Sequence, residues 1–182
     1  FLEVIIANGF DSNAIKILRA KKNLRLIDGT NYTSKELLKF VSINQDIMIQ
    51  SEDLNLFSSK NFKIVSKRKP TSNQLKDLMF AFNVCRYVKS NAIVLASNKT
   101  TVGIGSGQPS RLDSCQIAIN KMKKFNLQND NLVAASDAFF PFVDGIEKLV
   151  QAGVRAVVQP SGSIRDKEII NFANETNTVL LF

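Results

Sequence analysis

Three glycines and an arginine lie close together in TVGIGSGQPSRLDS, residues 101–114. Gly103, Gly105 and Gly107 would let the backbone approach a ligand or another segment closely, and the planar fork of Arg111 suits an anion such as phosphate. The G-x-G-x-G spacing differs from the dinucleotide fingerprint, and no Gly-Lys-Ser/Thr follows, so we do not expect a nucleoside triphosphate loop. The same residues are equally compatible with a strand end, a tight turn and a surface arginine.

Two further segments lie between a predicted strand and a predicted helix, SDAFFPFVD (136–144) and QPSGSIRD (159–166). Together with GSGQPSRLD (105–113), they would gather at the carboxyl ends of parallel strands, where open α/β sheets bind ligands and helix N-termini attract anions. The phenylalanines beside Asp137 could pack in the core or stack on a flat heterocycle. Asn91, at a predicted helix-to-strand corner, could cap the helix or recognise a carboxamide.

The chain of 182 residues contains no histidine and two cysteines, Cys85 and Cys115. Histidine performs most acid–base catalysis near neutral pH, so a catalytic base would have to come from outside this chain. With no CxxC pair and no histidine, we expect no metal site. Both cysteines fall on apolar helical stripes, which indicates buried free thiols and a cytoplasmic location.

Charge and hydropathy limit the partners. The net charge is +8 with an isoelectric point near 9.6, but basic residues are spread along the chain and no aromatic-interleaved basic stripe appears. The one dense run, KRK at 67–69, is typical of a solvated linker, and an RNA-binding domain is supported by charge alone. No run of eighteen apolar residues exists, so we expect no membrane partner.

The chain opens on FLEVIIA and closes on TVLLF, both typical of buried strands, which indicates a fragment of a longer polypeptide.

Apolar periodicity predicts alternating strands and helices, an α/β protein with a mixed, mostly parallel sheet covered on both faces. The predicted strands are 1–7, 24–28, 39–43, 46–50, 62–66, 92–96, 101–105, 132–136, 154–159 and 178–182. The predicted helices are 11–23, 73–89, one from 110, 145–153 and 164–175. Their predicted caps are Asp11 or Ser12, Thr71 or Ser72, Ser110 with Asp113, Asp144 with Glu147, and Ser163 with Asp166.

Four motifs occur in order: YVKSNAIVLA (87–96), TVGIGSGQPSRLDS, SDAFFPFVDGIE (136–147) and QPSGSIRD. They resemble the AICAR formyltransferase (transformylase) domain of the bifunctional AICAR transformylase/IMP cyclohydrolase family of purine biosynthesis. FLEVIIA and AIKILRAKKNLRL (14–26) fit the same domain further upstream, so the resemblance covers essentially the whole chain. It implies cytidine-deaminase-like three-layer α/β/α units without zinc. Residues 1–69 would be the remainder of a first unit with a linker, and 70–182 a second unit.

The resemblance implies transfer of a formyl group from 10-formyltetrahydrofolate to AICAR, by a homodimer whose active sites lie at the subunit interface, with no transition metal. The family's catalytic lysine–histidine pair would lie upstream and the cyclohydrolase domain elsewhere, so the chain alone would be inactive. The implied AICAR contacts are Glu3, Asn91, Arg111 and Phe139, and the implied folate contacts are Leu112, Asp144, Ser163 and Ile164.

Two other hypotheses remain at this point. A non-catalytic α/β module that binds a sugar phosphate or nucleotide would share the glycine–arginine loop and would need no histidine. An RNA-binding domain would show binding to arbitrary RNA that falls steeply with salt.

Overall fold

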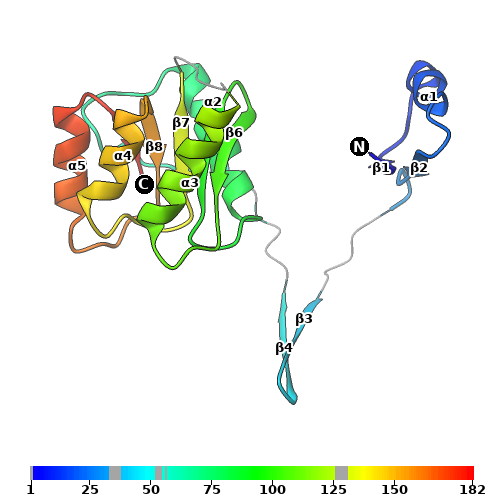
Figure 1. The fold of residues 1–182 in the computed structure, drawn as a ribbon, viewed down its shortest axis with the longest axis horizontal. Coiled ribbons are helices and arrows are strands. Elements are labelled where there is room, and N and C mark those ends of the chain that lie inside the picture. The colour runs from blue at the N-terminus through cyan, green and yellow to red at the C-terminus, as the bar shows by residue number, and fades with distance from the viewer. Residues whose placement is uncertain (1, 33–37, 52–54, 56, 126–130) are drawn as a thin grey trace. The chain divides into compact units, whose positions relative to one another are not determined.

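The computed structural model describes residues 2–32, 38–51, 55, 57–125 and 131–182. The chain forms two compact units, Phe1–Leu54 and Asn55–Phe182, whose elements are labelled in Figure 1. Each unit is described by itself.

The first unit contains a parallel strand pair and a hairpin. Strand β1 (Val4–Ala7) pairs in parallel with β2 (Arg25–Asp28) around helix α1 (Ser12–Arg19). The Asp11 carboxylate accepts hydrogen bonds from the first turn of α1, which confirms the predicted βαβ unit and its cap. Strands β3 (Leu38–Ile43) and β4 (Asp46–Ser51) form the antiparallel hairpin predicted around Asn44 and Gln45.

The second unit is built on a mixed five-stranded sheet of order β6-β5-β7-β8-β9. Strand β5 is antiparallel to both β6 and β7, while β7, β8 and β9 are parallel. Strands β6 to β9 therefore all end at the edge of the sheet where β5 begins. The bounds are Ile93–Ser97 (β5), Thr100–Gly105 (β6), Val133–Ser136 (β7), Ala156–Val158 (β8) and Val179–Leu181 (β9).

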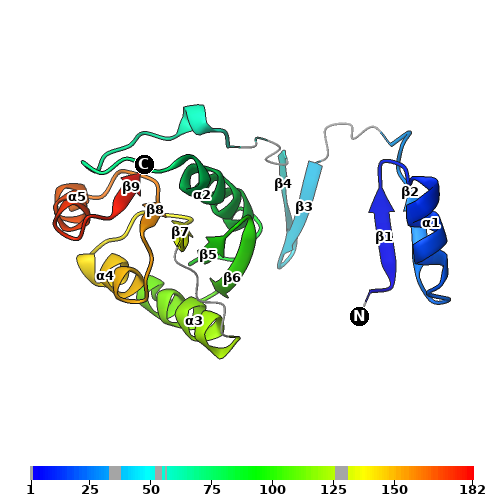
Figure 2. The same cartoon turned by 90° about the horizontal axis from the view of Figure 1, so that it is seen from above.

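Helices cover both faces of this sheet, which confirms the predicted α/β class. Helix α2 (Ser72–Cys85) lies on one face, and α3 (Arg111–Lys124), α4 (Val143–Gln151) and α5 (Asp166–Glu175) lie on the other, as Figure 2 shows. Alternate side chains of β5 enter the two cores, because successive strand residues point to opposite faces. The result is a three-layer α/β/α unit.

Two of the three clustered glycines serve the packing of α3 on β6. A Cβ atom on Gly105 would lie 1.9 Å from the Ser114 carbonyl oxygen, and one on Gly103 would lie 2.2 Å from that of Ala118. Both distances are far shorter than any van der Waals contact, so only glycine lets the helix lie this close. The close approach that the sequence predicts is therefore made by a helix of the same chain.

Residues 63–66 lie beside β9 in the second unit. Lys63 and Phe182 exchange two backbone hydrogen bonds of 2.7 and 2.9 Å. The predicted strand 62–66 is wrong, because the segment forms only one isolated bridge, between Ile64 and Leu181. The Ser66 hydroxyl accepts the Leu180 N–H at 2.8 Å and so replaces a further backbone pairing. The division at residues 69 and 70 into two related subdomains stays a prediction.

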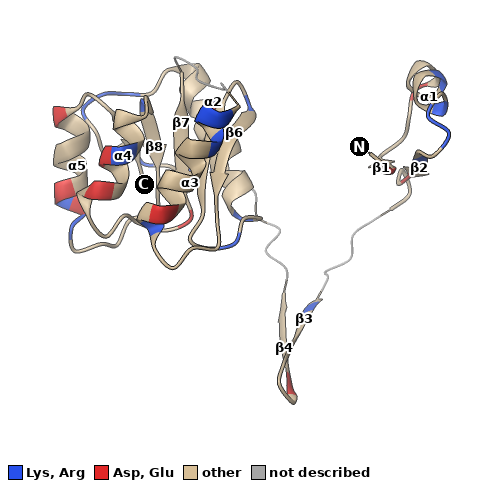
Figure 3. Ribbon diagram, viewed as in Figure 1, with Lys and Arg blue, Asp and Glu red and all other residues tan. Residues whose placement is uncertain are grey.

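The basic run at 67–69 is not simply a solvated linker. The Arg68 guanidinium donates to the Asn177 carbonyl oxygen at 2.8 Å, and the Lys67 N–H donates to the Asn174 side chain at 2.7 Å. A cation beside the carboxyl end of α5 is favourable, because unpaired carbonyls there carry partial negative charge. Elsewhere on the described part of the second unit, Lys and Arg are interspersed with Asp and Glu (Figure 3).

Helix caps were predicted with mixed success. Thr71 caps α2, as predicted, and it forms a capping box with Gln74 that was not predicted. Ser110 is the N-cap of α3, but its side chain makes no cap hydrogen bond, so the predicted box with Asp113 is wrong.

Helix α4 begins one residue before Asp144, with Phe142 as N-cap, so Asp144 does not cap it. It lies in the first turn, where its carboxylate accepts the Gly145 N–H. The Asp166 carboxylate accepts the Gly162 and Ser163 N–H groups, and α5 begins at Asp166.

Candidate functional site

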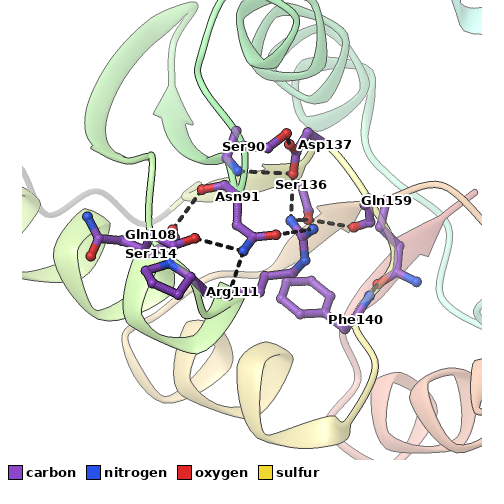
Figure 4. Close-up of polar contacts among 12 residues, drawn as sticks. Ser90, Asn91, Gln108, Arg111, Ser114, Ser136, Asp137, Phe140 and Gln159 are labelled. Carbon is purple, nitrogen blue, oxygen red and sulfur yellow. Dashed lines mark hydrogen bonds and ion pairs between the residues drawn. The ribbon is translucent and has the colours of Figure 1, made fainter.

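The three predicted loop segments converge where β5 begins. Ile93, the first residue of β5, pairs with Gly105 at the end of β6 and with Ser136 at the end of β7. The residues that precede β5 therefore meet the segments that follow β6 and β7. Figure 4 shows the resulting cluster of polar side chains around Asn91 and Arg111.

Arg111 is the centre of this cluster. One of its terminal nitrogens, Nη1, donates to Asp137 Oδ1 at 2.5 Å and to Ser136 Oγ at 2.9 Å, and the other, Nη2, donates to Asn91 Oδ1 at 2.8 Å. The side chains of Arg111 and Asp137 are only 11% and 16% exposed. Arg111 is thus a nearly buried member of an ion pair, and the surface arginine considered from the sequence is wrong.

The Asp137 carboxylate accepts hydrogen bonds from three residues. In addition to Arg111, the Ser90 hydroxyl donates to its carboxylate, as does the Ala92 N–H at 3.0 Å. Burial of the carboxylate raises its pKa, but hydrogen bonds from Ser90, Arg111 and Ala92 outweigh this effect and leave the pKa below its ordinary value. Asp137 is therefore ionised near neutral pH and holds the Arg111 guanidinium in one orientation.

Asn91 ties the loop between β6 and α3 to the start of β5. Its amide nitrogen donates to the carbonyls of Gln108 and Pro109 at 2.8 and 3.2 Å. Its backbone carbonyl accepts the Ser114 hydroxyl at 2.7 Å. Helix α2 ends at Cys85, so Asn91 does not cap it, and the other alternative, recognition of a carboxamide, stays a prediction.

A pocket of about 470 Å³ opens beside this cluster. Phe140 is 1% exposed and belongs to the core, while Phe139, 38% exposed, forms part of the pocket wall. One phenylalanine of DAFFPF is therefore core and another lies on the pocket side, while stacking on a flat heterocycle stays a prediction. The pocket is lined by Asn91, Pro109, Ser110, Arg111, Leu112, Ala138, Phe139, Phe140, Pro141, Phe142, Asp144 and Gly145.

The structure gathers five of the eight predicted site residues in this one pocket: Asn91, Arg111, Leu112, Phe139 and Asp144. Ser163 and Ile164 lie in the loop before α5 and do not line it, and the Ile164 side chain is fully exposed. Glu3 lies in the first unit, in a recess of about 340 Å³ shared with basic side chains.

Four polar residues of the cluster were missed from the sequence: Ser90, Ser114, Ser136 and Gln159. Asp137 was noted only as a neighbour of the phenylalanines. Ser136, Asp137 and Gln159 come directly at the ends of apolar strands, and polar side chains at such positions are a usable signal. Ser90 and Ser114 carry no comparable signal, because a serine at a loop or helix position is common.

The electrostatics of the pocket favour a neutral, hydrogen-bonding ligand group near Arg111. The Asp137 carboxylate already offsets the charge of the guanidinium. The guanidinium has further N–H donors, for which the described residues provide no acceptor. These donors can bind a carbonyl oxygen of a ligand, and the Phe139 ring beside them offers an apolar face to a flat ring.

Other chemistry finds less support in the described residues. They contain no cluster of three or more His, Cys, Asp or Glu side chains that could hold a metal ion, and none of their helices is long and apolar enough to cross a membrane. Cys85 and Cys115 are buried and free, as predicted. Burial raises the pKa of each thiol to about 12, so neither is a ready nucleophile.

The second unit is therefore a three-layer α/β/α structure whose pocket lies at the carboxyl ends of β6 and β7, the position at which open α/β sheets typically bind ligands. Residues 1–121 match the model of the AICARFT/IMPCHase bienzyme family, and the chain belongs to this family. It is 47% identical over 184 aligned residues to the bifunctional purine biosynthesis protein PurH of Buchnera aphidicola subsp. Schizaphis graminum and 45% identical to that of Persephonella marina. All of the chain is aligned in each case, and it spans about 35% of the length of each relative.

Proposed function

We propose that this chain contributes the nucleotide-binding part of an AICAR formyltransferase. The reaction would transfer the formyl group of 10-formyltetrahydrofolate to the 5-amino group of AICAR, giving FAICAR and tetrahydrofolate. Membership of the bienzyme family and the relatives' names place the chain in purine biosynthesis. The observation that carries the finer proposal is the pocket in which Asn91, Arg111 and Phe139 lie together with Leu112 and Asp144.

In this proposal the base of AICAR lies against Phe139. The unpaired donors of Arg111 would bind the neutral carboxamide oxygen, because the charge of the guanidinium is already offset by Asp137. Asn91 would complete this contact, and Glu3 of the first unit would contact the ribose. Leu112 and Asp144 would face the folate, with Ser163 and Ile164 from the neighbouring loop.

The contribution of these residues to the reaction would be positioning. The amine nitrogen of AICAR attacks the formyl carbon, the bond from that carbon to N10 of the folate breaks, the amine loses a proton and N10 gains one. Holding both reactants in contact makes this step effectively unimolecular. The chain has no histidine, so the proton acceptor and the group that stabilises the oxyanion would come from a lysine–histidine pair outside these residues. The active enzyme would be a homodimer, with IMP cyclohydrolase activity in another part of the protein.

Calorimetric titration of the chain with AICAR tests this proposal. Arg111→Lys keeps the charge and a contact with Asp137 but removes the planar fork, so we expect AICAR affinity to fall about tenfold. Phe139→Ala should weaken binding by a similar factor, because it removes the ring wall. Arg155→Lys, at an exposed position outside the pocket, is the matched control. Equal affinity of Arg111→Lys, Phe139→Ala and the wild type would contradict the proposal.

A further inference from the structure

We propose that Ser136 and Gln159 are positioning residues that fix Phe139 against the pocket, a role that rests on the proposed function. The two residues end adjacent strands: Ser136 is the last residue of β7, and Gln159 follows directly after β8. Because β7 and β8 are parallel neighbours, both side chains lie at the same edge of the sheet, beneath the loop that carries Phe139.

Both peptide units that flank Phe139 are hydrogen-bonded to side chains at the strand ends. The Ser136 hydroxyl donates to the Ala138 carbonyl oxygen at 2.6 Å, and the Phe140 N–H donates to Gln159 Oε1 at 3.3 Å. The first bond fixes the peptide unit before Phe139, and the second fixes the peptide unit after it. The backbone of Phe139 is thus restrained on both sides, while its ring remains 38% exposed in the pocket.

Three of the four side-chain hydrogen bonds of these two residues end on Arg111, Ala138 or Phe140, which line the pocket. Ser136 Oγ also accepts from Arg111 at 2.9 Å, and the Gln159 amide nitrogen donates to the Pro160 carbonyl at 3.4 Å. Figure 4 shows Ser136 next to Arg111, and the Gln159 amide beside Phe140. Both residues are 0% exposed, and a buried hydroxyl or amide adds little stability over an apolar residue of similar volume. We therefore infer that their main effect is on geometry. The Ser136 hydroxyl links the Arg111 guanidinium to the loop that carries Phe139, and the Gln159 amide accepts a hydrogen bond from the residue after Phe139.

This arrangement sets the position of the Phe139 ring relative to the Arg111 guanidinium. A ligand with a flat heteroaromatic ring and an adjacent carbonyl, as in AICAR, must contact the ring face and the guanidinium donors at the same time. If the loop that carries Phe139 could shift, the ligand would lose its contact either with the ring or with the Arg111 guanidinium. Ser136 and Gln159 would therefore determine affinity without touching the ligand.

The test measures AICAR affinity by calorimetry for Ser136→Ala and Gln159→Met, each in the wild-type chain and in a Phe139→Ala background. Each change removes the two side-chain hydrogen bonds of its residue at nearly constant volume, and we expect a loss of affinity of about five- to tenfold in the wild-type background. In the Phe139→Ala background the effect of Gln159→Met should disappear. The effect of Ser136→Ala should shrink but persist, because Ser136 also holds Arg111.

Two matched controls make the same chemical changes elsewhere. Ser97→Ala removes a buried hydroxyl that has no hydrogen-bond partner among the described residues. Gln116→Met removes an amide that bonds Lys148 and Asn120, outside the pocket. Both controls should leave AICAR affinity unchanged. Unchanged affinity in Ser136→Ala and Gln159→Met, or a full effect of Gln159→Met without the Phe139 ring, would overturn the inference.

Hydrogen exchange supplies a readout that does not depend on the ligand. Peptides covering residues 138–142 should exchange faster in Ser136→Ala and Gln159→Met than in the wild type and the two controls. If the wild-type chain fails to bind AICAR, the proposed function is contradicted, and the exchange data then decide the positioning role. Unchanged exchange in both variants would overturn that role. If Gln159→Met proved too unstable to measure, unchanged exchange in Ser136→Ala alone would overturn it.

Discussion

Removing one member of the ion pair between Arg111 and Asp137 should strongly destabilise the second unit. Both side chains are almost buried, at 11% and 16% exposure, so neither charge is well solvated if the other is removed. Asp137→Asn keeps the size of the side chain and removes its charge. Breaking a buried pair by removing one partner costs about 3–5 kcal/mol, because an uncompensated charge stays in a poorly solvated place.

The assay is urea unfolding monitored by circular dichroism. With a denaturant dependence of about 2 kcal/mol per molar, a loss of about 4 kcal/mol lowers the unfolding midpoint by about 2 M. Glu147→Gln makes the same chemical change on the exposed face of α4 and should shift the free energy of unfolding by no more than about 0.5 kcal/mol.

A double-mutant cycle separates the pair from its other contacts. Arg111→Met should also destabilise the unit, since it leaves the Asp137 carboxylate with only Ser90 and the Ala92 N–H. Arg111→Met combined with Asp137→Asn removes both charges and should cost at least about 2 kcal/mol less than the sum of the single changes. Strict additivity, or an Asp137→Asn variant as stable as Glu147→Gln, would refute the reasoning.

Two further predictions concern pH and packing. Against the opposing effect of burial, hydrogen bonds lower the folded-state pKa of Asp137 from 3.8, so its contribution to stability is present above that value and is lost as the pH falls through the folded-state pKa. The difference in stability between wild type and Asp137→Asn should therefore shrink as the pH falls below 3.8, and a difference that grows in acid would contradict this. Gly105→Ala places a Cβ atom 1.9 Å from a backbone carbonyl of α3 and should cost about 3 kcal/mol or more in thermal or urea unfolding. Gly29→Ala, whose nearest contact would be an ordinary 3.5 Å, is the control, and equal stability of the two variants would exclude the packing explanation.

The fold was largely predictable because its strands are short apolar runs and its helices carry apolar stripes. The runs at 92–96, 132–136 and 154–159 correspond to β5, β7 and β8 within two residues at each end. The exception, 62–66, has the same apolar pattern as a strand, but a serine hydroxyl takes the hydrogen bond that a strand partner would receive. An apolar pattern records burial beside a sheet, and it does not separate a strand from a segment that pairs with its neighbour at a single bridge.

The candidate site was predictable in part. Arg111 and Asn91 were recognised by type and by their place at the ends of predicted elements, and the three loop segments do lie at the predicted edge. The pairing of Arg111 with Asp137 was not predicted, since the two are separated by 26 positions and meet only because β6 and β7 flank β5. The glycine cluster indicated a close approach, but only the packed helix identifies the partner, because sequence spacing contains no information on which segment covers a strand.

The central claim is that AICAR binds in the pocket beside Arg111 and Phe139, and amide chemical-shift mapping of the isotopically labelled chain during an AICAR titration tests it most directly. The account predicts saturable shifts concentrated at residues 91, 111–112, 138–142 and 144. The absence of shifts at AICAR concentrations in the millimolar range, or shifts confined to the first unit, would contradict it.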